Sequence, residues 1–166
     1  MRKGITLFCA TLAALGLSVP AQAQRYVASL LDLDEARQTC FAATEQSEVD
    51  RLVIATSGWR PMKLVDDITG EQSLSDAIYY HPGSRALIVA VPDKSTCTAR
   101  ALVASMTEFE TYAEQFSEMN PERTESGGYL FCSSGRATLL RLTSTPNGPV
   151  ILATYKTKPE THTCPS

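Results

Sequence analysis

The sequence predicts an α+β fold in which about three helices pack on an antiparallel sheet of about five strands. Capping, charge and apolar patterns predict three helices, and five short runs are rich in β-forming residues. Turn sequences containing Gly, Pro, Asn and Ser join neighbouring runs as hairpins. With 166 residues, of which 43% are hydrophobic and 20% charged, the composition is that of one folded domain.

The first 23 residues have the three-part pattern of a secretory signal peptide. Arg2 and Lys3 begin it, residues 5–19 carry no charge, and the small-x-small end predicts cleavage after Ala23. A membrane anchor is the alternative, but Pro20 ends the apolar run before it could cross a bilayer. We therefore expect a single domain of residues 24–166 in a bacterial periplasm or outside the cell, with no membrane span after cleavage.

The charge of the chain disfavours a nucleic-acid partner. The formal net charge is −3 and becomes −5 once Arg2 and Lys3 leave with the leader. A protein that neutralises phosphates needs a surplus of Lys and Arg, which this chain lacks.

Four cysteines remain after the signal peptide and its Cys9 are removed. An even number in an oxidising compartment predicts two disulfides, and the absence of a C-x-x-C pair disfavours a redox or zinc motif. Strand order favours Cys132 with Cys164, because the tail easily spans from the end of a three-stranded meander back to its first strand. That choice leaves Cys40 to pair with Cys97.

Three helices are expected from their capping and apolar patterns. The first covers residues 34–43, with acidic residues in its first turn. The second begins at Ser47 and ends before Gly58, which suits the position after a helix. The third begins at Ser105 and shows apolar residues at three- and four-residue steps until Asn120.

The β-rich runs form two groups, and residues 61–74 between the second helix and the first group are expected to be a loop. Residues 77–81 and 86–91 form a hairpin, whereas residues 129–132, 137–143 and 150–156 form an antiparallel meander. The Arg-Ala pair at Arg85 recurs at Arg136 in an equivalent place. This weak echo raises the alternative of two α-β-β units produced by internal duplication.

Catalytic and cofactor motifs are scarce. His81 and His162 are the only histidines, and His81 stands near Ser84 and Asp76, so a hydrolase-like enzyme centred on His81 and Ser84 is one alternative. No G-x-S-x-G sequence supports it, and a solvated histidine in a turn is the simpler interpretation. Since metal-binding and nucleotide-binding motifs are also missing, we expect no metal and no cofactor.

Two runs are apolar on both faces of their predicted strands, residues 87–91 and 150–153. An antiparallel sheet with one wet face should alternate polar and apolar residues, so something must cover the second face. The candidates are a helix of this chain, a second copy, another protein or a ligand.

These observations favour a small non-catalytic protein that binds a partner protein or a small ligand through its sheet. Trp59, Tyr79, Tyr80 and His81 are the candidate contact residues, although core packing explains the aromatic residues equally well. A structural subunit of an envelope assembly is the further alternative, and an envelope protein or a second copy of the chain is the expected partner.

Overall fold

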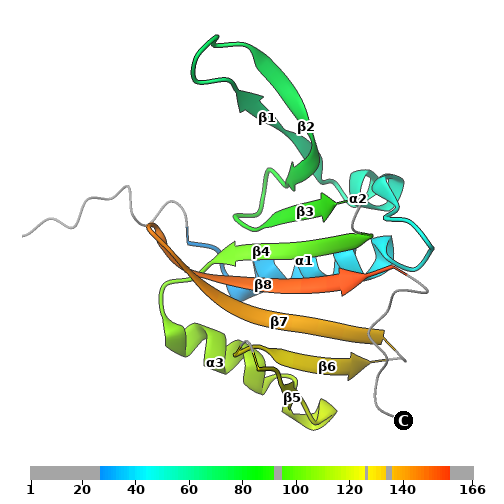
Figure 1. Ribbon diagram of the computed structural model, residues 1–166, viewed down its shortest axis with the longest axis vertical. Coiled ribbons are helices and arrows are strands. Elements are labelled where there is room, and N and C mark those ends of the chain that lie inside the picture. The colour runs from blue at the N-terminus through cyan, green and yellow to red at the C-terminus, as the bar shows by residue number, and fades with distance from the viewer. Residues whose placement is uncertain (1–26, 92–94, 126, 134–135, 158–166) are drawn as a thin grey trace, which may run out of the picture.

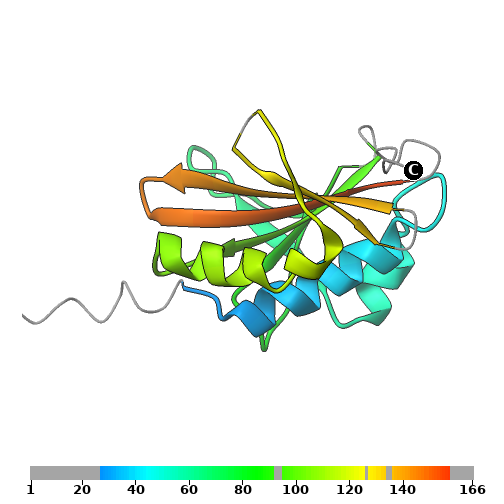
Figure 2. The ribbon, with the colours of Figure 1, turned by 90° about the horizontal axis from the view of Figure 1, so that it is seen from below.

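The computed structural model describes residues 27–91, 95–125, 127–133 and 136–157. Eight strands of these residues form one antiparallel sheet in the order β1-β2-β3-β4-β8-β7-β6-β5. The helices all lie against the same face of the sheet, which gives the molecule two layers (Figures 1 and 2). The strands are β1 (Arg60–Val65), β2 (Gln72–Tyr80), β3 (Leu87–Val91), β4 (Thr96–Leu102), β5 (Glu122–Arg123), β6 (Tyr129–Ser133), β7 (Arg136–Thr145) and β8 (Gly148–Lys156). The helices are α1 (Leu30–Ala43), α2 (Arg51–Thr56), α3 (Met106–Glu114) and the short 3-10 helix η3 (Ser117–Met119).

The α+β class is confirmed, but the expected number of strands is wrong. The five predicted strands correspond to β2, β3, β6, β7 and β8, and the structure adds β1, β4 and β5. The repeated unit is also different from α-β-β, because α2 and α3 each precede four strands. The last strands of the two groups, β4 and β8, pair with each other at the middle of the sheet.

Helix α1 begins four residues earlier than its acidic cluster predicts. The Ser29 side chain accepts a hydrogen bond from the Asp32 N–H, and the Asp32 carboxylate accepts one from the Ser29 N–H. This capping box satisfies two donors that a helix start leaves unpaired. Partial burial opposes ionisation of Asp32, but the hydrogen bonds from Ser29, Ser84 and Arg85 together outweigh it and lower the pKa of that carboxyl.

The inner face of the sheet is made of small residues where α1 crosses it. Ala90, Ala99, Ala101 and Ala153 are all buried on β3, β4 and β8. Because alanine adds only a methyl group, the helix backbone can approach the strands closely. In the other half of the molecule, the α3–η3 segment packs larger side chains, Phe109, Tyr112 and Phe116, against Tyr129 and Phe131.

Helix α2 is shorter than the sequence suggests. Asp50, not Ser47, is its N-cap, and the Asp50 carboxylate accepts hydrogen bonds from the N–H groups of Leu52 and Val53. Gly58 follows the C-cap Ser57, and its φ of +88° is a conformation that glycine adopts easily. A Cβ at Gly58 would lie 2.9 Å from the His81 imidazole, so close packing also requires glycine there.

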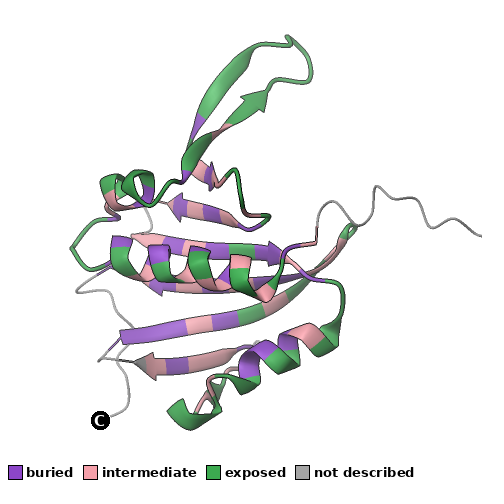
Figure 3. Cartoon of the chain, turned by 180° about the vertical axis from the view of Figure 1, so that it is seen from behind, coloured by how far each residue is buried: buried purple, intermediate pink, exposed green. Residues whose placement is uncertain are grey.

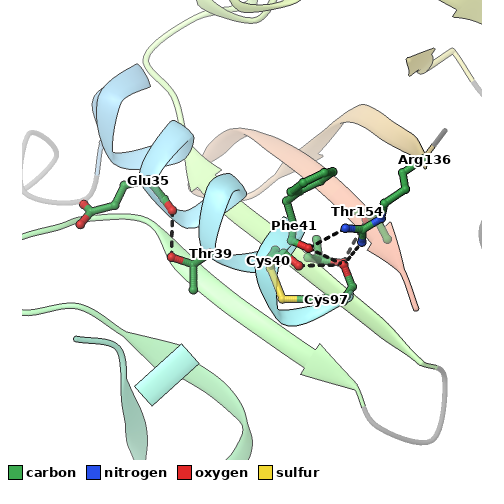
Figure 4. The surroundings of a disulfide bond; sticks show 9 residues. Glu35, Thr39, Cys40, Phe41, Cys97, Arg136 and Thr154 are labelled. Atoms are coloured by element: carbon green, nitrogen blue, oxygen red, sulfur yellow. Dashed lines mark hydrogen bonds between the residues drawn. A yellow bond between two sulfur atoms is a disulfide. The ribbon is translucent and has the colours of Figure 1, made fainter. Parts of the chain in front are cut away.

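The disulfide between Cys40 and Cys97 is confirmed, and it joins α1 to β4 (Figure 4). Two disulfides are expected from the sequence, whereas the described residues contain this one. Cys132 is not a free thiol, and its expected partner Cys164 lies outside the described residues. The expectations for residues 1–23 and for His162 also fall outside them.

The strand register separates the two faces of the sheet. Because Cys97 faces α1, Ala99 and Ala101 face it too, and Thr98 and Arg100 face the opposite side. The three α-helices cover the side of Cys97, as the views from below and behind show (Figures 2 and 3). No helix of the described residues crosses the opposite side, which we call the open face.

Candidate functional site

The open face is largely apolar across its central strands. Thr98 and Thr154 share a hydrogen bond of 3.0 Å at its middle. Half-buried aliphatic and aromatic residues surround them, namely Ile78, Tyr80, Leu87, Val89, Val91, Leu102, Leu130, Leu139 and Leu152. An apolar face of this breadth that no described helix covers is typical of an interaction surface.

A groove of about 450 Å³ is hollowed into one end of the open face. Its lining comes from β1, the β2–β3 connection, β3, β4, the end of β7, the β7–β8 turn and β8. The apolar part is formed by Met62, Ala86, Leu87, Leu102 and Val150, and the polar groups come from Ser84, Arg85, Arg100, Thr145 and Asn147. This volume and this mixture of a mainly apolar lining with a few polar groups are those of a small-molecule site.

Three arginines lie in one row across the open face. Paired positions across the strands run in the order Arg60, Tyr80, Leu87, Arg100, Leu152 and Arg141. All three arginines are exposed, and β3, β4, β7 and β8 contain no Asp or Glu. The central part of this face is therefore basic, although the chain as a whole carries a net charge of −3.

The four residues predicted to make contacts are divided between different parts of the molecule. Trp59 is 1% exposed and Tyr79 is 4% exposed, and both belong to the core beneath the helices. Tyr80 is half-buried and its register places it on the open face. His81 is half-buried with its ring centroid 5.6 Å from that of Trp59. The structure thus brings Trp59 and His81 together but leaves all four outside the groove lining.

His81 and Ser84 use their side chains in local contacts. The His81 Nδ1 accepts a hydrogen bond from the Gly83 N–H at 3.2 Å. The Ser84 hydroxyl accepts one from the Ala86 N–H at 3.1 Å and is hydrogen-bonded to the Asp32 carboxylate. Both groups therefore help to shape the β2–β3 connection at the edge of the groove.

A second cleft of about 300 Å³ lies between α1 and the α3–η3 segment. Phe41, Phe116 and Phe131 line it together with Arg37, whose guanidinium lies 5.3 Å from the Phe116 ring centroid. Arg37 is engaged by Asp34 at 2.7 Å and donates to the hydroxyl of Tyr155. The charge of this cleft is therefore already compensated within the chain.

Two tyrosines lie in the same region and are strongly affected by burial. Burial raises the pKa of Tyr112 well above the ordinary value and also raises that of Tyr155, and the nearby Arg37 opposes both shifts only in part. Both phenols therefore stay neutral at physiological pH and act as packing groups of the core.

The hairpin of β1 and β2 extends beyond the rest of the sheet (Figure 1). Ile68 at its tip is 95% exposed. The Asp66 carboxylate accepts hydrogen bonds from the N–H groups of Ile68 and Thr69, so the tip is a formed turn. These hydrogen bonds also lower the pKa of Asp66.

The sequence pattern predicts some residues of the groove and misses others. Leu87 and Val150 belong to the two runs noted as apolar on both faces, so their importance was visible in the pattern. Arg100 and Leu102 were missed because β4 was not predicted as a strand. The available signal was the alternation in residues 96–102, where small residues occupy every second position.

Neither a metal cluster, nor a membrane-spanning helix, nor a match to a known protein adds to this site among the described residues. Within the described ranges, no group of three His, Cys, Asp or Glu side chains could hold a metal ion. None of the described helices has the length and apolar character needed to span a membrane. No protein-family model, no curated protein and no solved structure matches the chain.

Proposed function

We propose that the chain is an exported, non-catalytic binding protein that holds a small molecule with an apolar body in the groove of its open face. The groove is the observation that carries this proposal, since it combines a volume of about 450 Å³ with an apolar lining on a face that no described helix covers. Export is supported by the leader pattern of residues 1–23 and by a disulfide, a bond typical of oxidising compartments.

A small ligand fits these observations better than a partner protein does. A protein docks on a broad surface, whereas the groove at the end near the β7–β8 turn has the size and the concave form of a small-molecule site. A binding role also fits better than hydrolysis, because the side chains of His81 and Ser84 bond to neighbouring backbone groups and not to each other. The described residues also contain no group of side chains that could hold a metal ion.

The proposal can be tested with N-phenyl-1-naphthylamine, an uncharged probe that fluoresces in apolar sites. The folded protein should bind it saturably, and Leu102→Asn should weaken binding by about tenfold because it removes apolar contact area from the groove. Leu139→Asn is the matched control, since Leu139 is a half-buried leucine of the open face outside the groove lining.

Circular dichroism establishes that both variants remain folded. Absence of saturable binding to the folded protein would refute the proposed function. Equal weakening by the two variants would show that the probe binds the face as a whole, and equal affinity of all three proteins would show that it binds elsewhere; either result would refute the groove as the site.

A further inference from the structure

We infer that the ligand of the groove carries an anionic group and that Arg100 recognises this group. The inference rests on the proposed function and deepens it, because it assigns the chemical class of the ligand. That class is a free amphipathic anion, with one carboxylate-like group beside the guanidinium and an apolar body over the leucines and Met62 of the groove.

Arg100 is surrounded by uncharged residues on the open face. Its neighbours across the strands on the open face are Leu87 and Leu152, and the next open-face positions along β4 are Thr98 and Leu102. None of these residues carries a charge. Among the described residues the structure gives the Arg100 guanidinium no hydrogen bond or ion pair, so its donors are available to a ligand.

Arg100 differs from other arginines of the chain in having no acidic partner within the described ranges. Arg37 is paired with Asp34, and Arg136 is paired with Glu45. Arg85, which also lines the groove, donates a hydrogen bond to the Val27 carbonyl at 3.2 Å and so is engaged within the chain. Arg100 instead stands on strands that contain no acidic residue, beside an apolar groove. A guanidinium forms paired hydrogen bonds with a carboxylate or phosphate, and such a site favours an anion over a neutral or cationic group.

The experiment compares three molecules with the same ten-carbon chain, namely decanoate, decanol and decyltrimethylammonium, as competitors of N-phenyl-1-naphthylamine. Decanoate should displace the probe at a concentration about tenfold lower than decanol does, and the cation should be the weakest competitor. Raising the salt concentration should weaken decanoate and leave decanol unchanged, because only the charged contact is screened.

Two variants assign the preference to a residue. Arg100→Gln should remove the advantage of decanoate over decanol without changing the affinity for decanol. Arg141→Gln should keep that advantage, since Arg141 is exposed in the same cross-strand row but outside the groove lining. Thermal unfolding provides the check that both variants are folded.

The outcomes separate the inference from the proposed function. If the probe binds and decanol displaces it as well as decanoate does, the anionic class is overturned while the groove remains a binding site. If Arg141→Gln removes the preference as fully as Arg100→Gln does, the assignment to Arg100 is overturned, because the charge of the whole face is then responsible. If the probe does not bind the unmodified protein, the proposed function itself fails.

Discussion

Arg136 shows how a single buried side chain joins the two layers. It is 3% exposed, and its guanidinium donates to the Phe41 carbonyl at 2.8 Å and to the Thr44 hydroxyl at the end of α1. It also pairs with the Glu45 carboxylate at 2.5 Å and lies 4.2 Å from the centre of the Phe41 ring. A cation at the C-terminal end of a helix is favourable, so Arg136 stabilises α1 on β7.

Arg136→Met should therefore destabilise the protein by about 2 kcal/mol, measured as a lower midpoint of urea unfolding. The methionine retains much of the side-chain volume but removes every donor to the end of α1. Arg141→Met, which changes an exposed arginine of the same strand, should leave the midpoint almost unchanged. Similar midpoints for the two variants would contradict the role assigned to Arg136.

Residues of the groove differ in how far their roles can be predicted from sequence. Leu87 and Val150 are predictable, because apolar residues at consecutive strand positions require cover on both faces. Arg100 is not predictable in this way, since an isolated arginine in a chain looks like any solvated surface residue. Its role depends on Leu152, which is far away in the sequence and becomes its neighbour only when β4 pairs with β8.

At the scale of elements, the strands that sequence analysis missed share a physical cause. A strand is recognised by alternation of large apolar and polar residues. On β4 the inward positions are Cys97, Ala99 and Ala101, which are small because α1 lies directly over them. The pattern on β1 is weak for a different reason, because Pro61 and Lys63 lie on an exposed edge strand that buries almost nothing. The two-residue β5 is too short to give any pattern.

The contact of α1 with β4 can be tested by removing their disulfide. The Cys40–Cys97 bond closes a separation of 57 residues, for which chain entropy alone predicts a stabilisation of about 4 kcal/mol. The double variant Cys40→Ala/Cys97→Ala should unfold at a clearly lower urea concentration than the oxidised protein. Genetic removal is preferable to reduction, because Cys132 is also disulfide-bonded and a reductant would act on both sites.

The variant needs a check that its secondary structure is retained. The far-ultraviolet circular dichroism of Cys40→Ala/Cys97→Ala should match that of the oxidised protein, because both retain the helices and the strands. If the double variant and the oxidised protein unfolded at the same urea concentration, the bond between α1 and β4 would not stabilise the fold, and this prediction would be wrong.

At the scale of the whole molecule, stability is expected to decrease from the middle of the sheet to its edges. Strand β4 pairs with β3 and β8 on its two sides and lies beneath α1, to which Cys97 is bonded. Strand β1 pairs with β2 alone, and the hairpin that they form is exposed over most of its length (Figure 3). Local opening requires less free energy where few buried contacts are lost.

Amide hydrogen exchange should therefore be slow in the central strands and fast in the β1–β2 hairpin, a difference that the sequence pattern does not predict. Peptides covering residues 96–102 should exchange among the slowest, close to the rate of global unfolding, together with those of β8. Peptides covering residues 60–74 should exchange about a hundredfold faster or more, because the hairpin can open while the core stays intact. The N–H groups of Ile68 and Thr69, which are hydrogen-bonded to Asp66 at the tip, report the exchange rate of a formed but exposed turn. Rapid exchange of residues 96–102 would contradict the position of β4 in the middle of the sheet. It would then also contradict the placement of Arg100 beside Leu87 and Leu152, on which the groove depends.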